Sequence, residues 1–254
     1  LIVAATGVGA GDLVAALVAG TNYGLVFLWA ILIGSILKFA LNEGVGRWHL
    51  TSGKTILEGW HIMGKWATGY FGVYSVIWGF VYGAAGTASC ALAMSALFPQ
   101  LSLTQWAIIH GIVAFILVWW GKYNTFEKVM NVLVGLMFIT VVGSALLVIP
   151  QLSDIWGTAV PALPEGSLLY ALGLIGGVGG SLTMASYGYW LQENKWTGPS
   201  FIRAVRIDSA IAYIVTALFT ISLLVLGAGL LYGTDTTIAG EKGLIEFASI
   251  LGNE

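Results

Sequence analysis

Seven apolar segments long enough to cross a lipid bilayer dominate this 254-residue sequence. A membrane-spanning helix needs about 20 predominantly apolar residues, and one cleavable leader peptide could not produce a pattern that repeats along the chain. Only 9% of the residues are charged, whereas a soluble domain carries about 25%. We therefore expect an all-α, polytopic membrane protein. The segments are 1–20, 23–42, 68–97, 103–120, 128–149, 167–192 and 204–232.

Positive charge is concentrated in alternate loops. Nine of the ten Lys and Arg residues lie in or beside the second, fourth and sixth loops, and Lys242 is the exception. The positive-inside rule makes those loops cytoplasmic. We therefore expect a multi-pass protein of the cell (inner) membrane with a cytoplasmic N-terminus. The nine residues are Lys38, Arg47, Lys54, Lys65, Lys122, Lys128, Lys195, Arg203 and Arg206.

Two of the connecting segments have a distinct composition. Residues 43–65 are moderately polar and contain Trp48 and Trp60, which predicts a short interfacial helix and a loop with aromatic rings at headgroup depth. Residues 150–166 contain three prolines and two acids and are expected to form an external loop. All five prolines fall in loops or at helix ends, so any interruption within a helix is assigned to glycine.

Glycine clusters interrupt the first and the sixth apolar segments. The first cluster spans residues 7–12 and the second spans residues 176–184. Hydrocarbon does not tolerate free backbone groups, so a broken helix must expose them to protein, water or an ion. Close helix packing explains spacings such as that of Gly83 and Gly86 well. It explains the paired glycines of the sixth segment less well, because each costs about 1 kcal/mol in a helix. We therefore expect two broken helices around a substrate site.

Asp12 is the strongest single candidate for a site residue. It lies in the first apolar segment directly after the glycine cluster. An ionisable side chain at mid-span costs at least about 2.5 kcal/mol and is a functional-site hypothesis by default. Alternatively, Asp12 pairs with a lysine or caps the second half of the helix, where the positive dipole end stabilises it. The two interpretations are compatible, and contact with a substrate is favoured.

Met184 follows the second cluster and is open to two interpretations. A thioether is a soft ligand that favours transition metals over Mg²⁺ or Ca²⁺. Methionine in a membrane helix is also ordinary packing. Ser181 and Thr183 could likewise donate oxygens to an ion or act as small packing residues.

Other polar residues are not expected to form a site. Cys90 is the only cysteine, so the chain cannot form an internal disulfide, and we expect a small buried side chain. His49 and His61 are expected in an exposed cytoplasmic loop. Charged residues near the predicted membrane edges, expected to be paired or to extend toward the headgroups, are Lys38, Glu43, Glu127, Glu193 and Asp208.

Several stretches together resemble the Nramp family of divalent-metal transporters, which have the LeuT-type fold of two inverted five-helix repeats. Residues 17–24 are similar to the end of that family's first helix, and Arg47 with residues 51–54 is similar to its basic second loop. Residues 180–184 resemble its sixth-helix motif, which ends in a metal-contacting Met. The resemblance covers the whole chain and implies the LeuT-type fold.

The chain departs from the family's pattern at several positions. The family's Asp-Pro-Gly-Asn motif falls on residues 9–12, so glycine replaces Asp at Gly9 and aspartate replaces Asn at Asp12. Residues 185–187 replace the Pro-His-Asn that follows the ligand Met. The acidic pair of the third helix aligns with Gly83 and Gly86. Because the family's His and acids are linked to proton movement, the resemblance implies a divergent branch with little or no proton coupling.

The resemblance and the residues together imply a site for a divalent cation of the Mn²⁺ or Fe²⁺ type, moved by alternating access. The cation is the transported substrate, and no cofactor is expected. The expected partners are the metal ion and the lipid bilayer, without nucleic acid. The site residues are Asp12, Met184, Gly9, Ala10 and Ser181, of which the last three contribute carbonyls, and the helix breaks are at Gly7, Gly11, Gly179 and Gly180.

Other functions remain open. A transporter of the same fold for Mg²⁺ or a small organic solute would share these features, and so would a non-transporting membrane subunit. No nucleophile–base arrangement, phosphate loop or Cys/His metal cluster is present, so we expect no enzyme. We interpret residues 1–149 as the first five-helix repeat and residues 167–254 as the start of the second. We also interpret the chain as a fragment of a longer protein.

Overall fold

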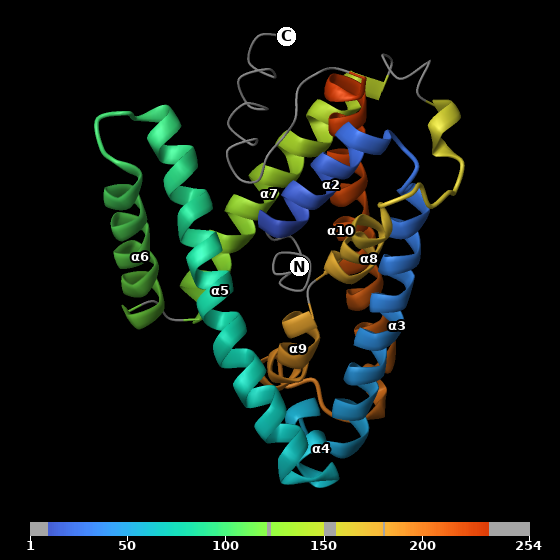
Figure 1. Cartoon of the computed structure of the whole chain (residues 1–254). Coiled ribbons are helices and arrows are strands. Elements are labelled where there is room, and N and C mark those ends of the chain that lie inside the picture. Colours follow the sequence, from blue (N-terminus) through green and yellow to red (C-terminus); the bar gives the residue numbers. More distant parts are fainter. Residues whose placement is uncertain (1–9, 121–122, 150–155, 180, 234–254) are drawn as a thin grey trace.

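The computed structural model describes residues 10–120, 123–149, 156–179 and 181–233, which are almost entirely helical and contain no strand (Figure 1). Six helices in these ranges are long and apolar enough to cross a membrane. They correspond to the second through seventh predicted spans. The remaining span is represented by α2 (Ala10–Tyr23), and its residues 1–9 lie outside the described ranges. The helices are α3 (Leu28–Ser52), α5 (Lys65–Leu97), α6 (Leu103–Trp120), α7 (Tyr123–Val148), the pair α8 (Leu168–Gly177) and α9 (Ser181–Glu193), and α10 (Ile202–Leu231).

The core lies where α2, α3, α8 and α10 meet (Figure 1). Its buried side chains are apolar and include Phe27, Ile31, Leu174, Phe219 and Leu224. The C-terminal part of α7 packs on the other side of α10, where Ala145 and Val148 join Leu17 and Leu226. The first and last described helices of the chain are thus held together near its centre.

Two glycines allow α2 and α10 to approach each other at the backbone. A Cβ atom on Gly20 would overlap the Leu224 carbonyl oxygen, and one on Gly227 would overlap the Leu17 carbonyl oxygen. Small residues at such crossings are typical of membrane helices, because van der Waals contact rather than the hydrophobic effect drives their association. The close contact fixes the position of α2 against α10.

The α3 helix is longer than predicted. The apolar segment ends near residue 42, but the helix continues to Ser52 and ends at Gly53, whose left-handed φ of 69° suits glycine. The extension is stable because α9 and α10 cover it: Asn42 and His49 are at most 1% exposed. The prediction that residues 43–65 form only an interfacial helix and loop is therefore wrong for their first ten residues.

The predicted interfacial helix is present as α4 (Ile56–Met63). Thr55 caps it: its hydroxyl accepts from the Glu58 backbone N–H, and the Glu58 carboxylate accepts from the Thr55 backbone N–H at 2.6 Å. This reciprocal arrangement, a capping box, gives hydrogen-bond acceptors to two backbone N–H groups at the helix start, those of Thr55 and Glu58. The hydrogen bond from the Thr55 backbone lowers the pKa of Glu58 and keeps it ionised.

Helices α5 and α6 form a hairpin beside the core rather than within it (Figure 1). Almost none of their membrane-length stretch is buried, because they pack mainly against each other. Cys90 on α5 is exposed, so the prediction of a buried cysteine is wrong. The Trp119 and Trp120 rings at the end of α6 are also more than 70% exposed, as suits aromatic residues at the membrane interface.

Candidate functional site: the interruption between helices α8 and α9

The sixth predicted span is two helices. The α8 helix ends at Gly177, and α9 begins at Ser181. Between them Val178 has a ψ of 109°, and Gly179 has a left-handed φ of 76°. Of the two glycines predicted to break this span, Gly179 lies in the interruption and Gly180 lies outside the described residues. The helix axis is therefore broken where the glycine cluster predicted it.

The surroundings of Gly179 require a glycine for two reasons. Its left-handed backbone is a conformation that residues with a Cβ rarely adopt. A Cβ atom there would also overlap the ring of Tyr213 on α10. Tyr213 is 2% exposed, so its ring cannot move aside without disturbing the core. Packing by α10 thus holds the interruption in place.

The end of α8 presents backbone acceptors to the interruption. The last bond of its ladder runs from the Val178 N–H to the Leu174 carbonyl at 3.3 Å. The final carbonyls of any helix lack partners within it, and the partial negative charge at this end favours a cation. The α8 helix packs against α2 and α3, whereas α9 packs against α3 and α4. The two halves therefore share α3 and differ in their second neighbour.

The first predicted break lies at the edge of the described residues. The α2 helix begins at Ala10, so Gly11, expected at an interruption, is itself helical. Asp12 follows Gly11 within α2. Gly7 and Gly9 lie outside the described ranges.

Met184 lies in the first turn of α9 and is half-buried. Its neighbours Thr183 and Ala185 are buried, and Ser181 is the first residue of the helix. The interruption and Met184 are thus separated by a single turn. That Asp12 and Met184 reach one cation stays a prediction.

No group of three or more His, Cys, Asp or Glu side chains that could hold a metal occurs within the described ranges. The described donors that follow or precede the interruption most closely in the chain are of other kinds: the carbonyls at the end of α8, the Thr183 hydroxyl and the Met184 thioether. At Gly83 and Gly86, where the resemblance places an acidic pair, an added Cβ would meet no atom within 4 Å.

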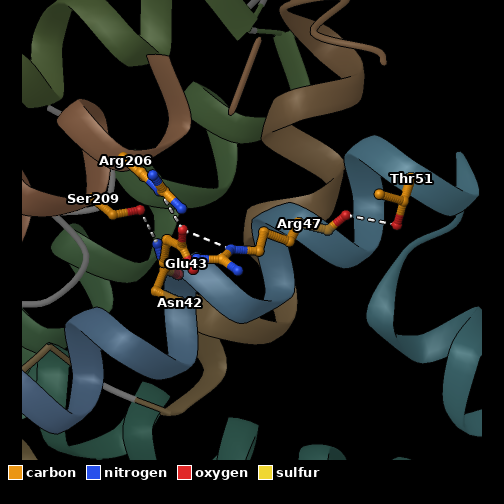
Figure 2. A network of polar contacts seen from close by, with 6 residues as sticks. All are labelled: Asn42, Glu43, Arg47, Thr51, Arg206 and Ser209. Atoms are coloured by element: carbon orange, nitrogen blue, oxygen red, sulfur yellow. Dashed lines mark hydrogen bonds and ion pairs between the residues drawn. The ribbon is translucent and has the colours of Figure 1, made fainter. Parts of the chain in front are cut away.

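A polar cluster that the sequence analysis did not identify as a unit joins α3 to α10 (Figure 2). Asn42 donates to the Ser209 hydroxyl at 2.9 Å, and neither residue is exposed. Glu43 accepts from the Nε atoms of Arg47 and Arg206, both at 2.7 Å. The expected pairing of Glu43 is therefore confirmed, and the pairing reaches across 163 residues of sequence.

The same end of α10 also contacts α9. The Tyr187 hydroxyl donates to the Asp208 carboxylate at 2.9 Å. His49, expected in an exposed loop, is instead 1% exposed, with its Nδ1 atom 3.3 Å from the Lys54 carbonyl oxygen. That prediction is wrong because the loop after α3 folds back over the helix, where the Trp48 indole donates to the Thr55 carbonyl at 3.2 Å.

Comparison with known proteins assigns the chain to a family. The model of a family described as natural resistance-associated macrophage protein-like, Nramp, matches residues 1–252. The chain belongs to the Nramp family. The resemblance inferred from the sequence is thereby confirmed, together with the multi-pass, all-α membrane architecture. The division of the sixth span into α8 and α9 agrees with the LeuT-type fold expected of an Nramp protein.

Two curated relatives are both named divalent metal cation transporter MntH. The protein from Chromohalobacter salexigens is 24% identical over 251 residues, and the one from Staphylococcus haemolyticus is 27% identical over 255 residues. These matches cover 92% and 94% of this chain and 56% of each relative. The chain thus spans about half the length of the curated Nramp relatives it matches.

Replacing Gly179 with alanine is expected to lower the thermal unfolding midpoint of the purified protein. The left-handed conformation alone costs an L-residue about 1–2 kcal/mol, and the new methyl group overlaps the Tyr213 ring. Gly176→Ala is the matched control, because Gly176 is helical and an added Cβ meets no atom within 4 Å. Equal midpoints for the two variants would contradict the assignment of the interruption to Gly179.

Proposed function

We propose that this chain carries the substrate site of a secondary transporter that moves divalent metal cations of the Mn²⁺ or Fe²⁺ type by alternating access. The observation that carries the proposal is the interruption at Val178 and Gly179, which lies about one turn before Met184 in the helix pair α8 and α9. Membership of the Nramp family and the names of the curated relatives support the same substrate class.

The donors at this position suit a soft divalent cation. The carbonyl end of α8 favours positive charge, and a thioether favours transition metals over Mg²⁺ and Ca²⁺. In the proposed site the Asp12 carboxylate supplies the negative charge, and the carbonyls of Gly9, Ala10 and Ser181 complete the ligands. Such use of half-helix ends and freed carbonyls is the usual way in which broken-helix transporters bind ions.

The proposed movement uses the interrupted helices. The α8 and α9 helices share α3 as a neighbour, but α8 also packs on α2 and α9 also packs on α4. In the proposed movement the two halves turn relative to each other about the interruption at Gly179. Rocking of the first and sixth helices against the others then opens the site to one side of the membrane at a time.

The proposed location is the cell membrane, with the N-terminus in the cytoplasm. Arg47 on α3 and Arg206 on α10 both contact Glu43, so they lie at the same end of these two helices (Figure 2). The positive-inside rule places that end in the cytoplasm.

Metal binding to the purified protein tests the proposed substrate class. We expect Mn²⁺ and Cd²⁺ to bind, and Met184→Ala to weaken both while leaving Mg²⁺ and Ca²⁺ unaffected. Met63→Ala is the control, because Met63 is 68% exposed on the short helix α4. Absence of Mn²⁺ and Cd²⁺ binding in the unsubstituted protein would exclude the proposed function. Equal binding by the two Met variants would instead remove Met184 from the site.

Metal uptake is expected to carry few or no protons. Glycines occupy the positions of the family's acids at Gly9, Gly83 and Gly86. A carboxylate must lose its proton to bind a metal, so Asp12 should make uptake weaker at low pH. One carboxylate cannot also provide a separate proton route. We expect Mn²⁺ uptake into proteoliposomes without acidification of the lumen, followed with a trapped pH dye. Proton influx comparable to the metal influx would refute this prediction.

A further inference from the structure

An apolar groove of about 300 Å³ runs between α3 and α10 on the outside of the helix bundle. Leu32, Ile36 and Phe39 form one wall, and Ala210, Ile214 and Ala217 are on the other. Leu32, Ile36 and Ile214 are about half exposed or more, so the groove is open to its surroundings. Both helices are long and apolar enough to cross a membrane, and an apolar lining of this kind suits contact with lipid.

The surface that lines the groove is almost entirely apolar. Ser35 is the only hydroxyl-bearing aliphatic residue in the lining, and its hydroxyl donates to the Ile31 carbonyl at 2.7 Å within α3. From residue 32 to residue 39 the groove follows about 10 Å of helix. A lipid acyl chain is also apolar and extended, so it fits this surface.

On both helices, the residues that line the groove are followed along the same helix face by residues of the polar cluster around Glu43. Phe39, Glu43 and Arg47 follow one another at four-residue spacing on α3, and Arg206 precedes Ala210 by four residues on α10. Residues four apart lie on the same helix face. By this spacing, one end of the groove lies next to Glu43, Arg47 and Arg206, whose contacts with one another are shown in Figure 2.

This end of the groove carries an excess of positive charge. Two guanidinium groups share the single Glu43 carboxylate, each through its Nε atom at 2.7 Å. Each guanidinium has four further N–H donors, and both arginine side chains are 54% exposed. Along residues 38–52 of α3 and 202–208 of α10 there are four Lys and Arg residues against two acids. One of those acids, Asp208, accepts a hydrogen bond from Tyr187 of α9.

We propose that this groove binds one anionic glycerophospholipid from the surrounding bilayer. An acyl chain lies between α3 and α10, and the phosphate contacts Arg47 and Arg206. Charge complementarity and the continuous apolar wall select this occupant over a zwitterionic lipid or a protein helix. The ring of Tyr213 lines the groove and also packs against Gly179, so the bound lipid adjoins the helix interruption.

Lipid titration of the full chain in detergent, followed by native mass spectrometry, tests the proposal. The probes are phosphatidylglycerol and phosphatidylcholine with identical acyl chains, added without metal, so the result is independent of the proposed transport. We expect phosphatidylglycerol to bind more tightly. Arg206→Gln should weaken phosphatidylglycerol binding about fivefold, the effect of losing about 1 kcal/mol of attraction per arginine. Phosphatidylcholine binding should stay unchanged, and Arg206→Lys should restore most of the preference.

Two controls separate the groove from general surface effects. Arg203→Gln removes a charge one turn away that makes no ion pair with Glu43, and should weaken the preference less than Arg206→Gln does. Ala210→Trp fills the groove and should reduce binding of both lipids, whereas Ala85→Trp on the exposed surface of α5 should not. Equal binding of the two lipids by the unsubstituted protein would overturn the proposal. So would equal losses in the two arginine-to-glutamine variants, or unchanged binding by Ala210→Trp.

Discussion

Replacing Gly227 with valine is expected to separate α2 from α10 and to prevent a stable fold. The added Cβ overlaps the Leu17 carbonyl oxygen and lies 3.1 Å from the Thr21 nitrogen. Both are backbone atoms of α2, and the Leu17 side chain beside them is fully buried. Overpacking costs about 1–3 kcal/mol where side chains can shift, and more where they cannot. We expect a loss above about 3 kcal/mol at this crossing, because only movement of a whole helix relieves the overlap.

The thermal unfolding midpoint in detergent and the yield of monodisperse protein measure this loss. Gly83→Val is the matched control, because Gly83 is also helical and an added Cβ there meets no atom within 4 Å. Gly20→Val makes a second test of the same crossing, since its Cβ overlaps the Leu224 carbonyl oxygen. A Gly227→Val protein as stable as Gly83→Val would show that the helices do not cross at these glycines.

Replacing Asp12 with asparagine is expected to weaken Mn²⁺ binding at least about 100-fold, since loss of the charged partner of a bound metal ion costs about 3 kcal/mol or more. Asparagine keeps nearly the size of the aspartate side chain. The substitution therefore removes the negative charge with little change in volume. A direct Mn²⁺ titration by calorimetry measures the effect.

Asp208→Asn is the control for Asp12→Asn. Asp208 is also an acid of a membrane-length helix, but it accepts a hydrogen bond from Tyr187 at 2.9 Å and belongs to the polar end of α10. Its substitution should leave Mn²⁺ affinity within about twofold, since no metal contact is lost. If Asp12→Asn binds Mn²⁺ as well as Asp208→Asn does, Asp12 does not bind the metal.

Hydropathy located the helices well where the apolar run and the helix end together. The predicted span 103–120 coincides with α6, and the predicted end at residue 97 coincides with the end of α5. Hydropathy did not predict the end of α3, because the last ten residues of this helix are polar enough to resemble a loop. Those residues are helical because α9 and α10 cover them, and such cover depends on residues far away in the chain.

The glycine pattern was informative for a local reason. Gly179 adopts a left-handed φ, and only glycine does so at little cost, so a cluster of glycines in an apolar segment marks a place where the helix can end. Its partner Tyr213 gives no such signal, because a tyrosine in an apolar segment has many ordinary roles. The same applies to Glu43, whose second arginine is 163 residues away.

From local properties alone, the sequence determined that the chain crosses a membrane repeatedly in helices and that the sixth span is interrupted. Apolar length and glycine content act on neighbouring residues, so they can be evaluated without knowing the fold. Tertiary structure alone decided that Gly20 and Gly227 set a backbone contact, that Asn42 meets Ser209, and that α3 and α10 enclose a groove. Each of these depends on the distance between residues remote in sequence, and only the packing of the helices sets that distance.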